Sequence, residues 1–309
     1  MRILSLEPYI TELIIAYGLA DSLVAVTDKC ELPKELPHVH RVILSETQTG
    51  PEKYINKEIS RHSLNLTAIR QANPDTVVAS LYKKSSLEQI SREDVLRLQA
   101  NLSVNIGSDV KLISYAPRTL EEIYEGQKEL SKQLKVPHKG IDSAGKIKAQ
   151  IMNWADNFYD RIKNKKVAFI SSIEPLTLAG FWIPDMIHAV SAHSENLAAA
   201  AEDKLITWED VVAYKPDVII VAPRNYTVKE SMATFKILEK KPGWEDVPAV
   251  KRGEVVFADG SATFYYPGHN IIDSMAILIS GLAGFESGYI TPRDSFFKLR
   301  WLEMQRHKI

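Results

Sequence analysis

The sequence predicts an α/β protein of two Rossmann-like lobes joined by one long α-helix. Short β-rich runs alternate with helical stretches in both halves of the chain. The turn Pro74-Asp75 in the first half recurs as Pro216-Asp217 in the second, each time between a short helical stretch and a buried strand. A single helical stretch over residues 142–165 lies between the two halves.

The first lobe is expected over residues 1–141. Its predicted elements are strand 2–5, helix 11–17, strand 23–26, helix 66–71, strand 76–79, helix 87–100, short extended pieces at 105–106 and 111–113, and helix 119–134. The last helix opens at Thr119, and Glu121 and Glu122 in its first turn suit the positive end of the helix dipole. This alternation is typical of a parallel sheet covered by helices.

The bridging helix is expected over residues 142–165. This stretch has no proline, no glycine after Gly145 and no strand pattern, and its apolar side chains recur at spacings of three and four. A usual helix has about 11–12 residues, and this longer one begins where the first βαβ series ends. We therefore expect a rigid link between the lobes, with a helix belonging wholly to the second lobe as the alternative.

The second lobe is expected over residues 166–288. Its predicted elements are strand 167–171, a helix from residue 184, helix 208–213, strand 218–222, helix 229–239 and strand 255–258. Residues 289–309 form an extension that carries five basic side chains, Arg293, Lys298, Arg300, Arg306 and Lys308. We expect this extension to pack as an additional helix on the first lobe, with a partner-binding tail as the alternative.

The predicted ligand site lies in the loops that follow the two repeated strands. These loops start near Ser80 and Pro223, at the carboxyl ends of central parallel strands, where open α/β sheets place ligands. If the two lobes face each other, the ligand cleft lies between them. The alternative is a single large doubly wound enzyme with a tandem duplication.

The composition and the missing motifs exclude several classes of protein. The chain has 38 Lys and Arg against 39 Asp and Glu, and no basic run is interleaved with aromatic residues, so a nucleic-acid interface is not expected. No uncharged apolar stretch approaches the roughly 18 residues of a membrane span. The sequence has no GxSxG, no P-loop and no GxGxxG after a strand. We expect a non-enzymatic monomer without a cofactor of its own.

The N-terminus bears on the location of the protein. Residues 1–8 enter a strand pattern at once, with no basic segment, long apolar run and cleavage site ahead of it. A natural start at Met1 predicts a cytoplasmic protein. If a signal sequence was removed, a periplasmic or lipid-anchored protein is expected instead.

A set of short motifs covers nearly the whole chain. They are the segment 3–13 with Gly18-Leu19, the turns at 73–78 and 215–220, Pro242-Gly243-Trp244, and the segment 247–255. In this order and spacing they resemble the periplasmic-binding-protein-like family of the cobalamin and iron-siderophore class, whose lobes are joined by one long helix. The resemblance implies non-enzymatic binding of cobalamin or a related corrinoid or metal chelate. An ABC-importer component for iron-siderophore or haem and a cytoplasmic tetrapyrrole-modifying or chelatase-like enzyme are the alternatives.

Two further motifs, at 179–184 and 259–268, resemble a cobalamin-binding subgroup of this family whose members often lack signal sequences. Where that subgroup tends to have Arg-Pro-Gly-Pro-Arg, this chain has Tyr266-Pro267-Gly268-His269-Asn270. Two cationic groups near the expected cleft are therefore replaced.

The resemblance also implies docking to an ABC permease through one carboxylate on each lobe. Glu209 matches the position on the second lobe. Thr67 stands at the equivalent position of the first lobe and cannot form a charge-assisted pair, although Glu58 or Glu52 could substitute from a neighbouring loop.

The ligand-binding side chains are expected in the strand-end loops, because a flat chelate with polar edges calls for aromatic faces and a few hydrogen-bonding groups. The candidates are Tyr9, Cys30, Tyr82, Phe181, Trp182, Arg224, Asn225, Phe264, Tyr265 and Tyr266. Cys30, the only cysteine, is expected to be a buried thiol, with a soft metal ligand as the alternative. His269 is a second candidate metal ligand.

Overall fold

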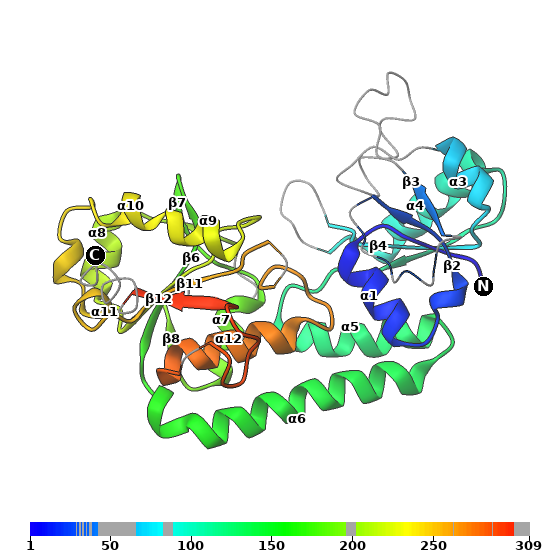
Figure 1. Ribbon diagram of the computed structural model, residues 1–309. Helices are drawn as coiled ribbons and strands as arrows, with labels where there is room; N and C mark the ends of the chain where they lie inside the picture. The colour runs from blue at the N-terminus through cyan, green and yellow to red at the C-terminus, as the bar shows by residue number, and fades with distance from the viewer. Residues whose placement is uncertain are drawn as a thin grey trace. The chain divides into compact units, whose positions relative to one another are not determined.

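The chain divides into two compact units, each an α/β lobe with its own sheet (Figure 1). The computed structural model describes residues 1–28, 30, 32, 34, 36, 39–42, 66–82, 89–195, 202–261, 263–285 and 287–299. Unit 1 comprises Met1–Pro117 and Ile123–Ala144, and unit 2 comprises Arg118–Glu122 and Gly145–Ile309. The predicted fold class of two α/β lobes is confirmed.

The sheet of unit 1 is entirely parallel, with the strand order β3-β2-β1-β4-β5. Its elements are β1 (Ile3–Ser5), α1 (Pro8–Ala16), η1 (Ala20–Ser22), β2 (Leu23–Thr27), β3 (His40–Val42), α3 (Leu66–Ala72), β4 (Thr76–Ala79), α4 (Arg92–Ile106), β5 (Lys111–Ser114) and α5 (Leu120–Gln133). Every residue of β1 and β4 is buried, as expected of central strands covered on both faces.

The chain of unit 1 changes direction across the sheet between β1 and β4. From β1 it proceeds to β2 and β3 on one side, and it then returns to β4 and β5 on the other. Such a topological switch point opens a crevice at the carboxyl ends of the two strands. Tyr9 follows β1 and Tyr82 follows β4, so both predicted ligand residues lie at this edge of the sheet.

The sheet of unit 2 has the strand order β12-β11-β10-β6-β7-β9, with β8 beside β6. Its elements are β6 (Lys166–Ile173), β7 (Leu176–Leu178), α7 (Trp182–Ala189), β8 (His193–Ser194), β9 (Lys204–Leu205), α8 (Trp208–Tyr214), β10 (Val218–Val221), α9 (Val228–Ala233), α10 (Phe235–Leu238), η2 (Trp244–Asp246), α11 (Pro248–Lys251), β11 (Val255–Ala258), α12 (Ile271–Ala283) and β12 (Phe296–Lys298). Strands β8 and β10 run parallel to β6 on its two sides, so the switch point of this unit lies between β6 and β10.

The predicted repeat of the two halves is confirmed in atomic detail. The carboxylate of Asp75 accepts a hydrogen bond from the backbone N–H of Arg2, and the carboxylate of Asp217 accepts one from that of Lys166 (2.9 and 3.0 Å). Arg2 directly precedes β1 and Lys166 opens β6. Each Pro-Asp turn therefore fastens the start of the central strand of its own unit.

Helix α6 (Pro137–Ile162) carries the chain from unit 1 into unit 2, because the boundary after Ala144 lies inside it. The helix starts five residues before the predicted position, since Pro137 suits a first helical turn and follows the left-handed residue Lys135 (φ +64°). Residues Arg118–Glu122 also belong to unit 2. The predicted division into a first lobe ending at 141, a bridging helix at 142–165 and a second lobe from 166 did not include this segment in the second lobe.

The described part of the C-terminal extension, residues 289–299, differs from its prediction, and residues 300–309 lie outside the described residues. Residues Phe296–Lys298 form strand β12, which pairs antiparallel with β11 in the sheet of unit 2 rather than forming a helix on the first lobe. Lys298 is fully buried, and its Nζ lies 2.7 Å from the Glu254 carboxylate. The alternating pattern of Phe296 and Lys298 facing inward is too short to identify from sequence.

One motif of the family resemblance has a structural role. The Trp244 ring of Pro242-Gly243-Trp244 lies 5.6 Å from the Trp208 ring, and Trp208 Nε1 donates to the Pro242 carbonyl oxygen (2.9 Å). Trp244 also packs edge-on against Phe235. This motif therefore belongs to the hydrophobic core of unit 2. None of the helices described is both long and apolar enough to cross a membrane.

Candidate functional site

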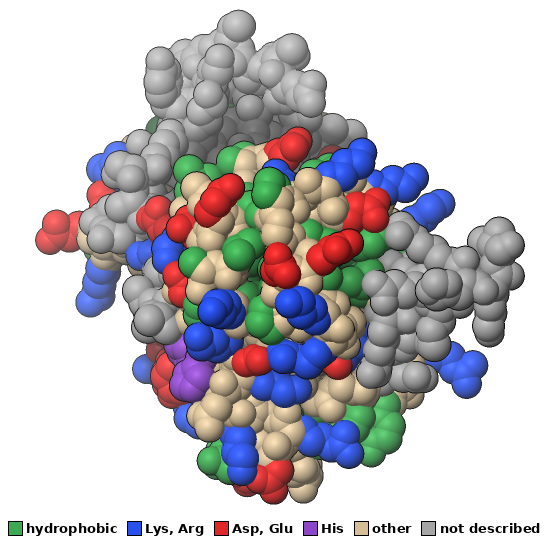
Figure 2. Space-filling view, turned by 90° about the vertical axis from the view of Figure 1, so that its left-hand side faces the viewer, with side chains coloured by type: hydrophobic (Ala, Val, Ile, Leu, Met, Phe, Trp, Pro, Cys, Tyr) green, Lys and Arg blue, Asp and Glu red, His purple; other side chains and the backbone are tan. Residues whose placement is uncertain are grey.

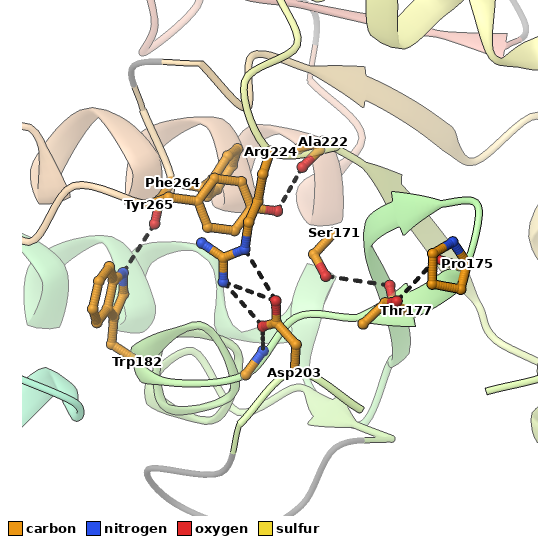
Figure 3. A network of polar contacts seen from close by, with 10 residues as sticks. Ser171, Pro175, Thr177, Trp182, Asp203, Ala222, Arg224, Phe264 and Tyr265 are labelled. Atoms are coloured by element: carbon orange, nitrogen blue, oxygen red, sulfur yellow. Dashed lines mark hydrogen bonds and ion pairs between the residues drawn. The ribbon is translucent and has the colours of Figure 1, made fainter. Parts of the chain in front are cut away.

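The clearest polar constellation lies at the switch point of unit 2 (Figure 3). Strand β10 ends at Val221, and the backbone N–H groups of Ala222 and Arg224 donate to the carbonyl oxygens of Ile170 and Ser171 in β6 (3.1 and 3.0 Å). These bonds fix the first residues of the loop against the neighbouring strand. The Arg224 side chain therefore starts from a backbone position held by the sheet.

Arg224 and Asp203 form a two-pronged ion pair. Arg224 Nε donates to Asp203 Oδ2 and Nη2 donates to Oδ1, each at 3.0 Å. The Gly180 backbone N–H also donates to Asp203 Oδ1, at 2.8 Å. Because two parallel N–H···O bonds fix the plane of a guanidinium group, Asp203 determines how the Arg224 head group is oriented.

Two aromatic rings flank the same guanidinium group. The Arg224 Cζ lies 4.0 Å from the centre of the Tyr265 ring and 5.9 Å from that of Phe181. Arg118 Cζ lies 5.8 Å from the Phe181 ring centre. Cations within about 6 Å of an aromatic face are attracted by the ring. Arg224, Asp203, Phe181 and Tyr265 together are called the Arg224 platform below.

The Tyr265 hydroxyl group is bonded to the loop that follows β10. It donates a hydrogen bond to the Ala222 carbonyl oxygen. Burial raises the pKa of Tyr265, and the nearby Arg224 cation opposes that shift only in part. The phenol therefore stays protonated near neutral pH, and its ring edge stays fixed beside Arg224.

Trp182 and Phe264 were also predicted to face a ligand, but the structure places both side chains inside unit 2. Trp182 Nε1 donates to the Phe264 carbonyl oxygen (3.0 Å), and the Phe264 ring packs edge-on against Phe169 at 4.9 Å. The exposed fractions of Trp182 and Phe264 are 6% and 0%. In this structure both rings stabilise the core that supports the Arg224 platform.

The remaining candidates of unit 2 lie near the same loops. Asn225 is exposed in a left-handed conformation (φ +65°), and its backbone N–H donates to the Gly260 carbonyl oxygen at 3.0 Å. Tyr266 is half-buried and His269 is exposed. Among the residues that the structure describes, no three His, Cys, Asp or Glu side chains are grouped to hold a metal ion.

In unit 1 the predicted aromatic residues gather at the edge of the sheet. Tyr9 is buried, with its ring 6.2 Å from that of Tyr115, and burial raises the pKa of both phenols. Tyr82 is half-buried and donates from its hydroxyl to the Pro117 carbonyl oxygen (3.0 Å). Of the two predicted aromatic ligand residues in this unit, Tyr82 is the more accessible.

Cys30 lies in a small buried polar cluster of unit 1. Its Sγ is 3.2 Å from the Thr11 hydroxyl and 3.2 Å from the Thr27 hydroxyl, and 1% of the residue is exposed. Burial raises the pKa of the thiol, although hydrogen bonds from both threonines act in the opposite direction. A protonated, enclosed sulfur is a poor metal ligand, so the geometry favours the buried-thiol interpretation.

The comparison with protein families shows to which family this chain belongs. The periplasmic binding protein family matches residues 3–262. The chain belongs to this family. A curated relative, the uncharacterized ABC transporter substrate-binding lipoprotein YvrC of Bacillus subtilis, is 25% identical over 269 residues, which cover 84% of this chain and 72% of the relative.

Solved structures of other periplasmic binding proteins share the fold. A possible iron-binding protein from Staphylococcus epidermidis superposes with a TM-score of 0.67 at 17% identity (91% of this chain, 97% of that chain). The vitamin B12 binding protein BtuF of Vibrio cholerae gives 0.60 at 18% (91% and 96%). A haem-binding protein from Pseudomonas aeruginosa gives 0.64 at 17% (96% and 97%). At these identities the likeness shows the fold alone.

The two docking positions that the sequence predicts for this periplasmic binding protein hold the same place in the equivalent helices α8 and α3. Glu209 is exposed in the first turn of α8, between Thr207 and Asp210 of the capping box. Thr67 is exposed at the same position of α3. The alternative carboxylates Glu52 and Glu58 lie outside the described residues.

Sequence reasoning missed two residues of the site. Asp203 is 21 residues from Arg224 and lies in a stretch with no motif, and Arg118 precedes a helix of the first predicted lobe. Neither residue is part of a periodic pattern, because an ion pair leaves none in the sequence. The one local signal is the charge of Asp203 just before a short edge strand.

Proposed function

We propose that this protein is the solute-binding component of an ABC importer and reversibly binds a corrinoid or a related metal chelate. No bond of the ligand is made or broken, and the protein acts as a monomer without a cofactor of its own. Membership of the periplasmic binding protein family supports the solute-binding role, and the name of the B. subtilis relative supports the importer. The titles of the B12-, haem- and iron-binding structures support the ligand class.

The Arg224 platform is the observation on which the ligand class depends most. Phe181 and Tyr265 provide apolar ring surface, and the guanidinium group between them provides N–H donors, at the sheet edge where α/β folds bind ligands. A flat macrocycle rimmed by polar groups needs this combination of stacking surface and directional donors.

The B. subtilis relative is named a lipoprotein, and the family is named for the periplasm. We therefore propose that the protein works outside the cytoplasm, anchored or free, in place of the cytoplasmic location expected for a natural start at Met1. Glu209 would supply the contact of unit 2 with the permease.

The test is a calorimetric and visible-absorbance titration with cyanocobalamin, cobinamide, haem and a ferric siderophore. We expect saturable binding of at least one, with the ligand recovered chemically unchanged. Phe181→Ala should weaken binding about tenfold, or about 1.4 kcal/mol, because stacking surface is lost. Tyr159→Ala, which removes an aromatic ring 49% exposed on α6, is the matched control and should leave the affinity unchanged.

Binding that survives Phe181→Ala undiminished would remove the Arg224 platform from the ligand site. Failure of all four compounds to bind would refute the ligand class, and conversion of a bound compound would indicate an enzyme instead.

A further inference from the structure

We infer that Asp203 makes this site select metal chelates with uncharged, amide-type rims over chelates that carry carboxylates. The inference rests on the proposed function, because it concerns the preference of the same site. Asp203 acts through Arg224 and is therefore a positioning residue that also sets the charge of the Arg224 platform.

The first argument is the use of the Arg224 donors. The Nε and Nη2 edge of the guanidinium group, which would bind a ligand carboxylate in a two-pronged manner, is already taken by Asp203. Asp203 is held in turn by the Gly180 N–H. A ligand carboxylate could then reach only the end-on edge of Nη1 and Nη2, next to an internal carboxylate that accepts three hydrogen bonds. A neutral carbonyl oxygen can accept from the outer nitrogen, Nη1, without bringing a second negative charge to this group. Within the described part of the chain, Nη1 makes no hydrogen bond.

The second argument is the balance of charge around Phe181. Arg118 and Arg224 contribute +2, and Asp203 and Glu122 contribute −2, so these four side chains sum to zero. Glu122 lies in the same turn as Arg118, because its Oε2 accepts from the Arg118 backbone N–H at 2.7 Å. These four side chains therefore leave no net positive charge that would offset the loss of hydration of a carboxylated ligand.

The third argument is the accessibility of the pair. The Arg224 and Asp203 side chains are 37% and 25% exposed, so the ion pair lies at the surface of unit 2 rather than in its core. A ligand resting on the Phe181 and Tyr265 rings would approach both charges. Asp203 would then repel any anionic group that approaches Arg224.

The experiment compares two pairs of probes whose members differ in charge at the rim. One pair is cyanocobalamin and its monocarboxylic acid, in which one side-chain amide is hydrolysed, and the other is haem dimethyl ester and haem. The measured quantity is the ratio of the two dissociation constants within a pair, at low and at high salt. The unmodified protein should prefer the uncharged member of the pair it binds.

Two variants should move this ratio in opposite directions. Asp203→Asn keeps the size of the side chain and an acceptor for the Gly180 N–H, and it should lower the preference for the uncharged member about tenfold. That is the effect expected of one charge at roughly 6 Å in an environment between protein surface and bulk water. Arg224→Gln leaves Asp203 uncompensated and should raise the preference. Both effects should shrink at high salt.

Two further variants are controls. Asp203→Glu retains the charge and should retain the preference. Asp246→Asn removes a carboxylate that is 79% exposed and paired with Lys251, and it should change nothing. A general loss of folding would weaken both members of a pair alike and leave their ratio unchanged, and if Asp203→Asn fails to fold, Arg224→Gln decides the question.

An unchanged ratio in Asp203→Asn and Arg224→Gln, with binding intact, overturns the inference and leaves the proposed function standing. If the unmodified protein binds neither pair, the inference fails. The proposed ligand class fails with it only if cobinamide and the ferric siderophore do not bind either.

Discussion

Gly260→Ala tests how the two loops of the unit 2 site are held together. Gly260 lies two residues after the end of β11, and its backbone both donates to the Tyr226 carbonyl oxygen (2.8 Å) and accepts from the Asn225 N–H (3.0 Å). A Cβ at residue 260 would overlap the Pro223 carbonyl oxygen and would lie 2.9 Å from the Ala222 carbonyl oxygen, whereas ordinary contacts are 3.4–4 Å. The atoms in the way are backbone atoms, so no side chain can rotate to make room.

The loops must therefore separate, and both hydrogen bonds are strained or lost. Two hydrogen bonds contribute about 1 kcal/mol each, and overpacking of this kind costs roughly 1–3 kcal/mol. We expect Gly260→Ala to lower the free energy of unfolding of unit 2 by about 3–5 kcal/mol in urea titrations followed by tryptophan fluorescence. Ligand binding should weaken as well, because Arg224 starts from the displaced loop.

Gly145→Ala is the matched control. Gly145 lies within α6, and a Cβ there would meet no atom within 4 Å. Alanine in an open helical position should raise stability by about 0.5–1 kcal/mol. A loss below about 0.5 kcal/mol for Gly260→Ala would show that the loops yield easily, and the reasoning from close backbone approach would be refuted.

Two other predictions concern buried groups. Glu254→Ala removes the carboxylate, 17% exposed, that lies beside the fully buried Lys298 ammonium group. We expect the free energy of unfolding to fall by about 2–4 kcal/mol in the same urea titration. A fall of less than about 1 kcal/mol would mean that water already solvates Lys298. Burial encloses the Cys30 thiol and raises its pKa. The folded protein should therefore react with a thiol reagent at pH 8 at least a hundredfold more slowly than the protein unfolded in urea. Comparable rates would show that the cluster of Cys30, Thr11 and Thr27 opens readily.

Much of the fold could be predicted because its signals are local. The Pro-Asp turns at Pro74 and Pro216 identify equivalent points of the two halves, and the structure adds the reason, since each aspartate binds the start of a central strand. The long helix could be recognised from an uninterrupted apolar spacing, although its start at Pro137 was placed five residues too late. The strand β12 escaped notice because three residues carry too little periodicity.

The site could be predicted only in part, because loop position does not tell which way a side chain points. Phe181 and Trp182 are adjacent in sequence, yet Phe181 lies half-exposed beside Arg224 and Trp182 is buried. The difference arises at Phe181, whose left-handed φ of +57° turns the chain as α7 begins. A sequence pattern contains no information on that angle.

The exposed face of unit 2 shown in Figure 2 has Lys and Arg side chains interspersed with Asp and Glu. This mixture agrees with the nearly balanced charge of the chain. It does not indicate a partner of strongly positive or strongly negative charge. We therefore expect specific recognition to come from individual contacts, such as those proposed above for Arg224 and Glu209.

The sequence by itself determined the class of fold, the internal repeat and the loops that follow the central strands, because strand burial, turns and helix length are encoded over a few neighbouring residues. Only the tertiary structure decided that Arg224 is paired with Asp203, that Phe264 is core and that the C-terminal strand joins the second sheet. Those outcomes depend on which distant segments pack together, and packing across a sheet is a property of the folded chain as a whole.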